Sequence, residues 1–205
     1  MNGAGRVRVS VSRRPPPTGT LSERAKQSFE LVTREALRQG LCPEGETVSI
    51  DTVQTLPKKM AEKKVVLLSI ATQTFRLVLG LLVRFDADSK AHFARLNRVE
   101  DIAEWSEQAF QDAVAECGNI IVGSMNRELG RYFPNVGMST PNLLDRDALG
   151  YLDALGAGHT RWLKVQGLPL DFYAVLFVAP SGSVDFHAEV ERAPDEVDSG
   201  ELEMF

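Results

Sequence analysis

The chain has 205 residues, of which 43% are hydrophobic and 25% are charged, and its formal net charge is −5 at pH 7. This ordinary globular composition allows one domain with a substantial core. No run of 18 apolar residues occurs, and no apolar segment of 7–15 residues follows the first residues, so we expect neither a membrane-spanning helix nor a secretory signal and predict a cytoplasmic protein.

The two ends of the chain carry opposite charge. Residues 1–19 contain four arginines and no acid, whereas residues 193–205 contain five acids and no base. Neither end has the apolar periodicity needed to bury surface, so we predict that both are disordered and flank one domain over residues 20–192. Four arginines without aromatic partners are a poor signal for nucleic acid, and we expect no nucleic-acid partner.

The first half of the domain reads as one helix followed by three strands. Residues 22–39 form an amphipathic helical pattern that Gly40 should end. Apolar and polar residues alternate in segment 47–55, and segments 65–71 and 75–85 are strongly apolar, so we predict three consecutive strands. Because segment 75–85 is apolar enough to be central or paired through an exposed edge, we also expect a homodimer.

The second half begins with helices and ends with strands. Residues 86–97 predict a helix, and a longer helix should run from near Val99 to about Phe133. We expect a short extended piece over 137–144, one or two helical turns over 145–155, and an antiparallel meander of three strands. These strands are predicted at 159–165, 172–178 and 184–190.

This order of elements predicts an α+β fold. An antiparallel sheet would carry the long helices packed on one face. Strand triplets on either side of the central helices also indicate a rough internal duplication, with two pseudo-duplicated halves.

The second half of the predicted long helix carries a polar stripe. Residues three and four positions apart lie above one another on a helix, so five residues share one side. They are Asp112, Glu116, Asn119, Gly123 and Asn126. The opposite side is apolar and should be buried, which leaves the stripe accessible. Its members are Val114, Cys117, Ile121, Met125 and Leu129.

Gly118, Asn119 and Gly123 are unfavourable inside a helix. Asn costs several tenths of a kcal/mol and Gly about 1 kcal/mol relative to Ala. A missing side chain at Gly123 would let another backbone or a bound group approach Asn119 closely. The alternative is that the glycines serve tight helix packing.

No intrinsic metal site is apparent in the sequence. Cys42 and Cys117 are 75 residues apart, and none of the three histidines has ligand spacing. Because Cys117 lies on the apolar side of its helix, we predict a small buried residue rather than a nucleophile.

The motif Asp112-Ala-Val-Ala-Glu116-Cys-Gly-Asn119, followed by Ser139-Thr140-Pro141, resembles that of the CheC/CheX/FliY family of chemotaxis phosphatases. That motif is an Asp or Ser, three residues, Glu, two residues, Asn, and a proline 21 to 22 residues later. Here Pro141 follows Asn119 by 22 positions, and Glu-x-x-Asn occurs only once. The resemblance is therefore closest to the single-site CheX branch.

The resemblance implies a CheX-like (CheC-like) fold and a function in two-component signalling. The substrate would be the aspartyl phosphate of a CheY-like response-regulator receiver domain, which would supply the Mg²⁺, so no intrinsic cofactor is expected. By analogy, Asn119 would orient the attacking water and Glu116 would bind a lysine of the receiver. Four further residues complete the predicted binding site, namely Asp112, Gly123, Asn126 and Pro141.

Several questions stay open at the level of sequence. Asp112 could contact the receiver or accept a hydrogen bond within the chain, and Pro141 could do no more than shape its loop. The stripe could merely solvate an exposed helix face, or the chain could be a non-catalytic adaptor that binds a receiver. Segment 86–107 is also longer than we expect for a compact CheX-like domain.

Overall fold

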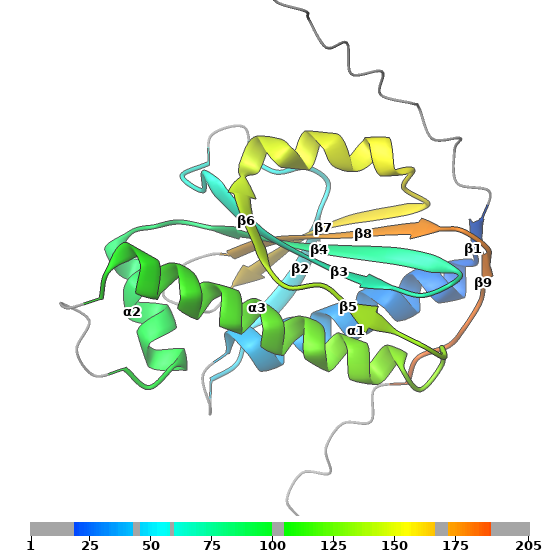
Figure 1. Cartoon of the computed structure of the whole chain (residues 1–205), viewed down its shortest axis with the longest axis horizontal. Coiled ribbons are helices and arrows are strands. Elements are labelled where there is room, and N and C mark those ends of the chain that lie inside the picture. The colour runs from blue at the N-terminus through cyan, green and yellow to red at the C-terminus, as the bar shows by residue number, and fades with distance from the viewer. Residues whose placement is uncertain (1–18, 43–45, 58–59, 100–104, 167–171, 190–205) are drawn as a thin grey trace, which may run out of the picture.

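The computed structural model describes residues 19–42, 46–57, 60–99, 105–166 and 172–189. Apart from Gly19, both predicted disordered ends lie outside these residues. The described chain is a mostly antiparallel sheet with helices on both faces, so the predicted α+β fold is confirmed (Figure 1).

Seven strands form the main sheet, and every neighbouring pair in it is antiparallel. The strand order is β2-β7-β8-β4-β3-β5, and β6 also pairs with β3. The strands are β2 (Ser49–Val53), β3 (Lys64–Ala71), β4 (Phe75–Val83), β5 (Gly137–Met138), β6 (Asn142–Asp145), β7 (His159–Gln166) and β8 (Phe172–Pro180).

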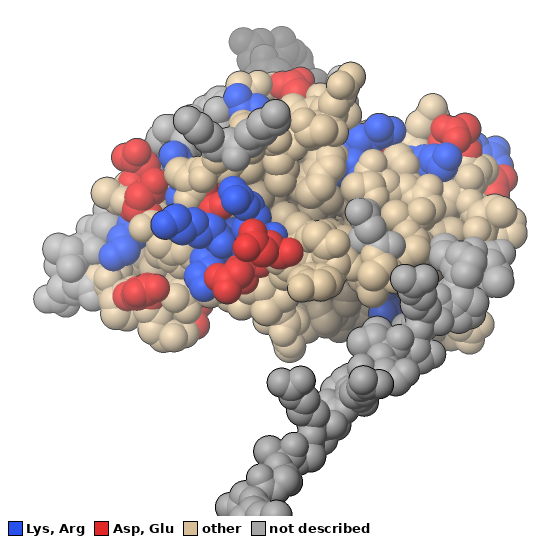
Figure 2. Space-filling model, turned by 90° about the horizontal axis from the view of Figure 1, so that it is seen from above, with Lys and Arg blue, Asp and Glu red and all other residues tan. Residues whose placement is uncertain are grey.

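Three α-helices cover one face of the sheet, and a 3₁₀ helix lies on the other (Figure 1). They are α1 (Glu23–Leu41), α2 (Ala87–Leu96), α3 (Glu107–Leu129) and the 3₁₀ helix η1 (Arg146–Leu155). Seen from above, basic and acidic side chains cluster side by side among wide uncharged areas (Figure 2). This view of the described residues shows no continuous basic stripe of the kind that follows a nucleic-acid backbone.

The sheet order is symmetric about the central pair of β4 and β8. Moving outward, β3 corresponds to β7 and β2 corresponds to β6. A long helix precedes each set of three, namely α1 and α3. The topology therefore contains two pseudo-duplicated halves, and α2 lies between them in the sequence.

The main core lies between the sheet and α1 and α3. Phe29 of α1 meets Phe75 of β4 edge to face, with ring centroids 4.9 Å apart, and both side chains are fully buried. Burial of one such side chain contributes roughly 1.5–3 kcal/mol. The two helices approach so closely that a Cβ on Gly40 would overlap the Ile121 side chain. This contact fixes α3, and with it the predicted stripe, against the body of the domain.

Side-chain caps set the start of each helix. Ser22 Oγ accepts from the Ala25 N–H, and Asp86 Oδ1 accepts from the Ser89 N–H, close to the two predicted helix starts. For α3 the cap is Ser106, which accepts from the Ala109 N–H at 3.1 Å.

The predicted extent of the long helix was wrong. It begins at Glu107 rather than near Val99, and it ends at Leu129 rather than near Phe133. The Asp112 to Asn119 stretch therefore lies in the first half and centre of α3, not in its second half. The first helix likewise continues to Leu41, one residue beyond the stop predicted at Gly40.

The predicted meander was wrong in its third strand. Only β9 (Ser183–Val184) forms in that segment, and it pairs in parallel with β1 (Thr20–Leu21), outside the main sheet. Residues 185–189 have no regular structure. In addition, β4 lies between β3 and β8, so it offers no exposed edge, and the sequence argument for a homodimer through segment 75–85 does not hold.

Candidate functional site

The predicted stripe lies on the side of α3 that faces away from the core. Asp112 and Glu116 are exposed, and Asn119 and Gly123 are half-buried. All five residues predicted for the opposite side are buried, as expected. They are Val114, Cys117, Ile121, Met125 and Leu129. Helical periodicity has therefore placed the polar residues at a surface that a partner can reach.

Glu116 and Asn119 form a hydrogen-bonded pair at the centre of the stripe. The Asn119 Nδ2 donates to Glu116 Oε2 over 3.2 Å. The second N–H of the Asn119 amide and its carbonyl oxygen form no hydrogen bond with the described residues. The pair thus offers an oriented amide and an exposed carboxylate one turn apart.

Asp112 lies one turn before Glu116 and also accepts a hydrogen bond within α3. Its Oδ1 is 2.8 Å from Nε2 of Gln108, which is itself exposed. The sequence left open whether Asp112 contacts a receiver or accepts a hydrogen bond within the chain. The structure contains this internal hydrogen bond. Asp112 Oδ2 remains available at the surface.

The two glycines of the motif have different environments. A Cβ on Gly118 would lie 3.0 Å from Leu68 Cδ1, so this glycine allows α3 to pack closely on β3. A Cβ on Gly123 would meet no atom within 4 Å. The helix-packing explanation therefore applies to Gly118, whereas Gly123 leaves an open space next to Asn119 on the stripe.

Pro141 lies in a β-bulge on the edge of the sheet. Ile70 of β3 pairs with Met138 and Leu67 pairs with Asn142, so two residues of β3 face the three residues 139–141. Ser69 N–H donates to Ser139 Oγ at 2.9 Å, in place of a carbonyl of the ladder. Proline suits a bulge in an edge strand because it has no N–H to pair.

The bulge and the stripe are joined through one residue of β3. Leu68 is one of the two β3 residues that face the bulge, and it also forms the contact with α3 at Gly118. Leu68 of β3 thus contacts the turn of α3 that carries Glu116 and Asn119, and it also lies next to the segment that contains Pro141. The motif residues, 22 positions apart in sequence, belong to one region of the structure.

Asn126 is the predicted site residue that least resembles the others. It is half-buried, and its Oδ1 is buried with no hydrogen bond from the described residues. Its carbonyl oxygen is therefore turned away from the open surface that Glu116 occupies. Its predicted part in binding rests on the spacing alone.

Cys117 is a buried packing residue, as predicted. The residue is 4% exposed, and its thiol donates to the Gly40 carbonyl at 3.1 Å. Burial, with a smaller effect of Glu116, raises the pKa of this thiol to about 12. Burial and then Glu46 also raise the pKa of Cys42. Neither environment stabilises the thiolate that a nucleophile requires.

The structure adds two residues to this surface that the sequence analysis missed. Ile120 follows Asn119 and is 53% exposed, although it is large and apolar. Arg127 lies seven positions later on the same side of α3 and is exposed. An isoleucine on the polar side of an amphipathic helix was the signal in the sequence.

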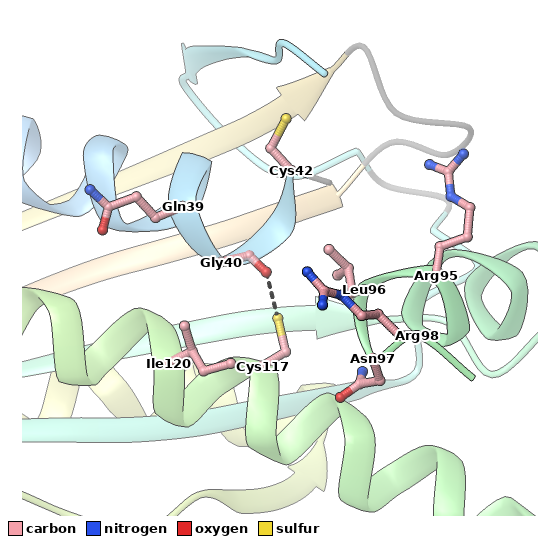
Figure 3. Close-up of a pocket in the computed structure, with 9 residues that line it drawn as sticks. All are labelled: Gln39, Gly40, Cys42, Arg95, Leu96, Asn97, Arg98, Cys117 and Ile120. Atoms are coloured by element: carbon pink, nitrogen blue, oxygen red, sulfur yellow. Dashed lines mark hydrogen bonds between the residues drawn. The ribbon is translucent and has the colours of Figure 1, made fainter. Parts of the chain in front are cut away.

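A cavity of about 410 Å³ borders Ile120, where the end of α1 approaches α2 and α3 (Figure 3). Arg95, Leu96, Asn97 and Arg98, at the end of α2, form one wall of the cavity. The opposite wall comes from the last turn of α1, and Cys117 and Ile120 of α3 lie below it in this view. The long segment noted in the sequence thus contributes a helix and a cavity beside the stripe.

The described residues contain no group of three or more His, Cys, Asp and Glu side chains arranged to hold a metal ion. Nor is any helix in this part of the chain long and apolar enough to cross a membrane.

No family model and no curated protein sequence match the chain. Its structure, however, is similar to CheX in a CheX–CheY–BeF3–Mg complex from Borrelia burgdorferi, with a TM-score of 0.52 and 16% identity over 75% of this chain and 96% of that one. A chemotactic CheC-like protein from Shewanella oneidensis has a TM-score of 0.51 and 12% identity, over 74% and 95% of the two chains. CheX from Vibrio vulnificus has a TM-score of 0.50 and 11% identity, over 77% and 97%. At these identities the similarity establishes the fold: the chain has the fold of the CheC/CheX/FliY family, in agreement with the motif in its sequence.

Proposed function

We propose that the protein is a phosphatase that hydrolyses the aspartyl phosphate of a CheY-like receiver domain. The observation that carries this proposal is the Glu116–Asn119 pair, which is hydrogen-bonded over 3.2 Å on the accessible side of α3. The CheX-like fold supports it, because the similar structure from Borrelia burgdorferi is a complex of CheX with CheY, BeF3 and Mg. The pathway would be chemotaxis or a related two-component system in the cytoplasm.

Hydrolysis of an acyl phosphate requires little covalent chemistry from the enzyme. Water attacks phosphorus in line with the leaving carboxylate oxygen, the P–O bond breaks, and the aspartate and inorganic phosphate separate. The free N–H and the carbonyl oxygen of the Asn119 amide would hold this water, because Glu116 already orients the amide through its other N–H. Such positioning can supply a large part of the rate enhancement.

Glu116 would also fix the register of docking. Its carboxylate is exposed and can pair with a lysine of the receiver, and a pair that becomes desolvated in the interface contributes strongly to binding. The open space at Gly123 would allow the receiver to approach the Asn119 amide. Mg²⁺, which the receiver would carry, would neutralise charge on the phosphoryl oxygens.

A non-catalytic receiver-binding adaptor is the alternative. The Asn119 amide already has Glu116 as a partner, and the same pair could bind a receiver without orienting water. The two functions differ in whether Asn119 changes the rate or only the affinity.

The test is the rate of phosphate release from phosphorylated receiver domains encoded in the same genome. We expect acceleration by the wild type and a loss of about 100-fold in kcat for Asn119→Ala. Gln111→Ala is the matched control, because Gln111 is another carboxamide of α3 that donates to a glutamate, Glu107, at 3.2 Å. If the protein binds a receiver without accelerating phosphate release, and Asn119→Ala does not change this binding, the adaptor function would remain.

A homodimer remains a prediction. Because β4 is central, association through the sheet would have to use the outer strands β2 or β5 and β6 instead. Light scattering coupled to size-exclusion chromatography would give the mass in solution.

A further inference from the structure

We propose that Glu116, Ile120 and Arg127 form a docking line along α3 that recognises one element of the receiver surface in a single direction. The element would present a basic, an apolar and an acidic side chain in that order. This inference rests on the proposed function for the identity of the partner, but it concerns recognition rather than hydrolysis.

The apolar member of the line is Ile120. Among the described residues it is the large exposed hydrophobic side chain of α3, and it directly follows Asn119. A single exposed isoleucine is common on protein surfaces and would not by itself indicate a partner. Here it lies one turn from Glu116, at the edge of the cavity of about 410 Å³ (Figure 3). An apolar partner side chain that covered Ile120 would find room beside it.

Gly123 leaves the surface open between Ile120 and Arg127. No atom lies within 4 Å of the position that a Cβ would occupy there. The glycine is unfavourable within the helix, and no packing contact of the described residues accounts for it. A partner side chain lying over Gly123 would account for the missing Cβ.

The basic member is Arg127, which forms no ion pair or hydrogen bond among the described residues. Two neighbouring arginines differ: Arg131, in the turn after α3, pairs with Glu128 at 3.4 Å, and Arg38 of α1 pairs with Glu35 at 3.2 Å. Arg127 lies in the last turn of α3, where a cation also interacts favourably with the helix dipole. It borders a groove of about 390 Å³ between α1 and α3. Its guanidinium is therefore available to a carboxylate from outside the domain.

The geometry of a helix relates the three residues. Positions four and seven apart lie on one side, and the 11 steps from Glu116 to Arg127 span about 16.5 Å at 1.5 Å per residue. An acid at one end and a base at the other distinguish the two directions in which a partner could lie. Reversed docking would bring like charges together, which disfavours it strongly.

The test measures the affinity of receiver domains from the same genome, loaded with Mg²⁺ and beryllofluoride, by isothermal titration calorimetry. We expect Ile120→Lys and Arg127→Glu each to raise Kd about tenfold or more, with kcat at saturating receiver within about twofold of the wild type. Ile120→Ala provides a milder variant should the lysine affect folding, which thermal melting would reveal.

Matched controls carry the same changes elsewhere. Leu31→Lys alters a 38% exposed side chain of α1, and Arg76→Glu alters an exposed arginine of β4. Both should leave Kd within about twofold. The proposal is overturned if Ile120→Lys and Arg127→Glu behave like these controls, or if no receiver binds the wild type.

The outcomes separate this inference from the proposed function. Tight binding that depends on Ile120 and Arg127 without any acceleration would keep the docking line and remove the phosphatase. Acceleration that depends on Asn119 but not on Ile120 or Arg127 would keep the phosphatase and remove the docking line.

Discussion

The amide of Asn119 and the carboxylate of Glu116 are joined by a hydrogen bond of 3.2 Å across one turn of α3. The bond fixes the plane of the amide before any partner is present. A carboxylate accepts such a bond more strongly than a neutral group does. Glu116 therefore has two separable properties, namely its charge, which a partner can sense, and its oxygen, which orients Asn119.

Glu116→Gln would separate these two properties. The glutamine oxygen can still accept from Asn119, so we expect kcat at saturating receiver to stay within a few-fold of the wild type. The lost charge should weaken binding by about 1.5–3 kcal/mol, or roughly 10- to 100-fold in KM, if the carboxylate binds a lysine. Glu116→Ala should reduce both kcat and affinity. Equal losses of kcat in the two variants would show that the charge itself acts in the reaction.

Gly123 and Gly40 provide a matched pair for the free energy of unfolding. Gly123→Ala places a methyl group in open space and should stabilise the protein by about 0.5–1 kcal/mol, since alanine is the better helix former. Gly40→Ala would overlap Ile121 and should destabilise it by about 1–3 kcal/mol. Urea denaturation measures both. A destabilised Gly123→Ala protein would mean that the space next to Asn119 is filled in solution.

The sequence predicted the elements whose signal is local. Segments 65–71 and 75–85 are apolar on both sides because β3 and β4 lie inside the sheet with helices on both faces. The start of α3 was missed, although Ser106 followed by Glu107 is a helix-start signal, because apolar residues further upstream extended the helical pattern.

The segment after β9 illustrates what alternation does not reveal. Val184, Phe186 and Ala188 are buried, so the pattern correctly indicated a covered side. The backbone there bonds to a side chain of α1 instead of a strand: Ser28 Oγ donates to the Phe186 carbonyl and accepts from the Ala188 N–H. Alternation reports which side chains are buried, whereas the partner of the backbone is decided by distant parts of the chain.

For the candidate site, too, the sequence predicted the local features but not those that depend on distant parts of the chain. Spacing alone placed Glu116 and Asn119 on the exposed side of a helix. It could not place residues 139–141 opposite Leu68 and Ser69, because the register of β5 and β6 on β3 depends on residues about 70 positions apart. Nor could it distinguish Gly118, which packs, from Gly123, which does not.

Pro141 tests whether the bulge contributes to the reaction. Pro141→Ala releases the backbone of the unfolded chain and should lower the free energy of unfolding by about 0.4–1 kcal/mol. We expect kcat to stay within about twofold, because the proline offers no group to the substrate. Pro134→Ala, in the turn after α3, controls for the loss of a proline elsewhere. A tenfold fall in kcat for Pro141→Ala alone would assign the bulge a positioning role.

His92 of α2 makes stability depend on pH. The residue is 1% exposed, and the centroid of its ring lies 5.2 Å from that of the Phe172 ring. Burial, and then the charge of Arg95, lowers the pKa of His92 to about 4, while the backbone of Leu41 and the charge of Glu46 act in the opposite direction. The folded protein therefore keeps this imidazole neutral at a pH where the unfolded chain protonates it.

His92→Leu should remove this dependence. Between pH 6.5 and about 4, unfolded wild-type chains bind a proton at His92 that folded chains do not, so the free energy of unfolding falls as the pH falls, by at most about 1.4 kcal/mol per pH unit. The variant should lose less stability than the wild type over this interval and should show the same dependence above it. His187→Leu, which alters an exposed histidine, is the control for the loss of an imidazole elsewhere in the chain. Urea denaturation at pH 7, 6, 5 and 4.5 measures the difference, and parallel curves for His92→Leu and the wild type would contradict the low pKa.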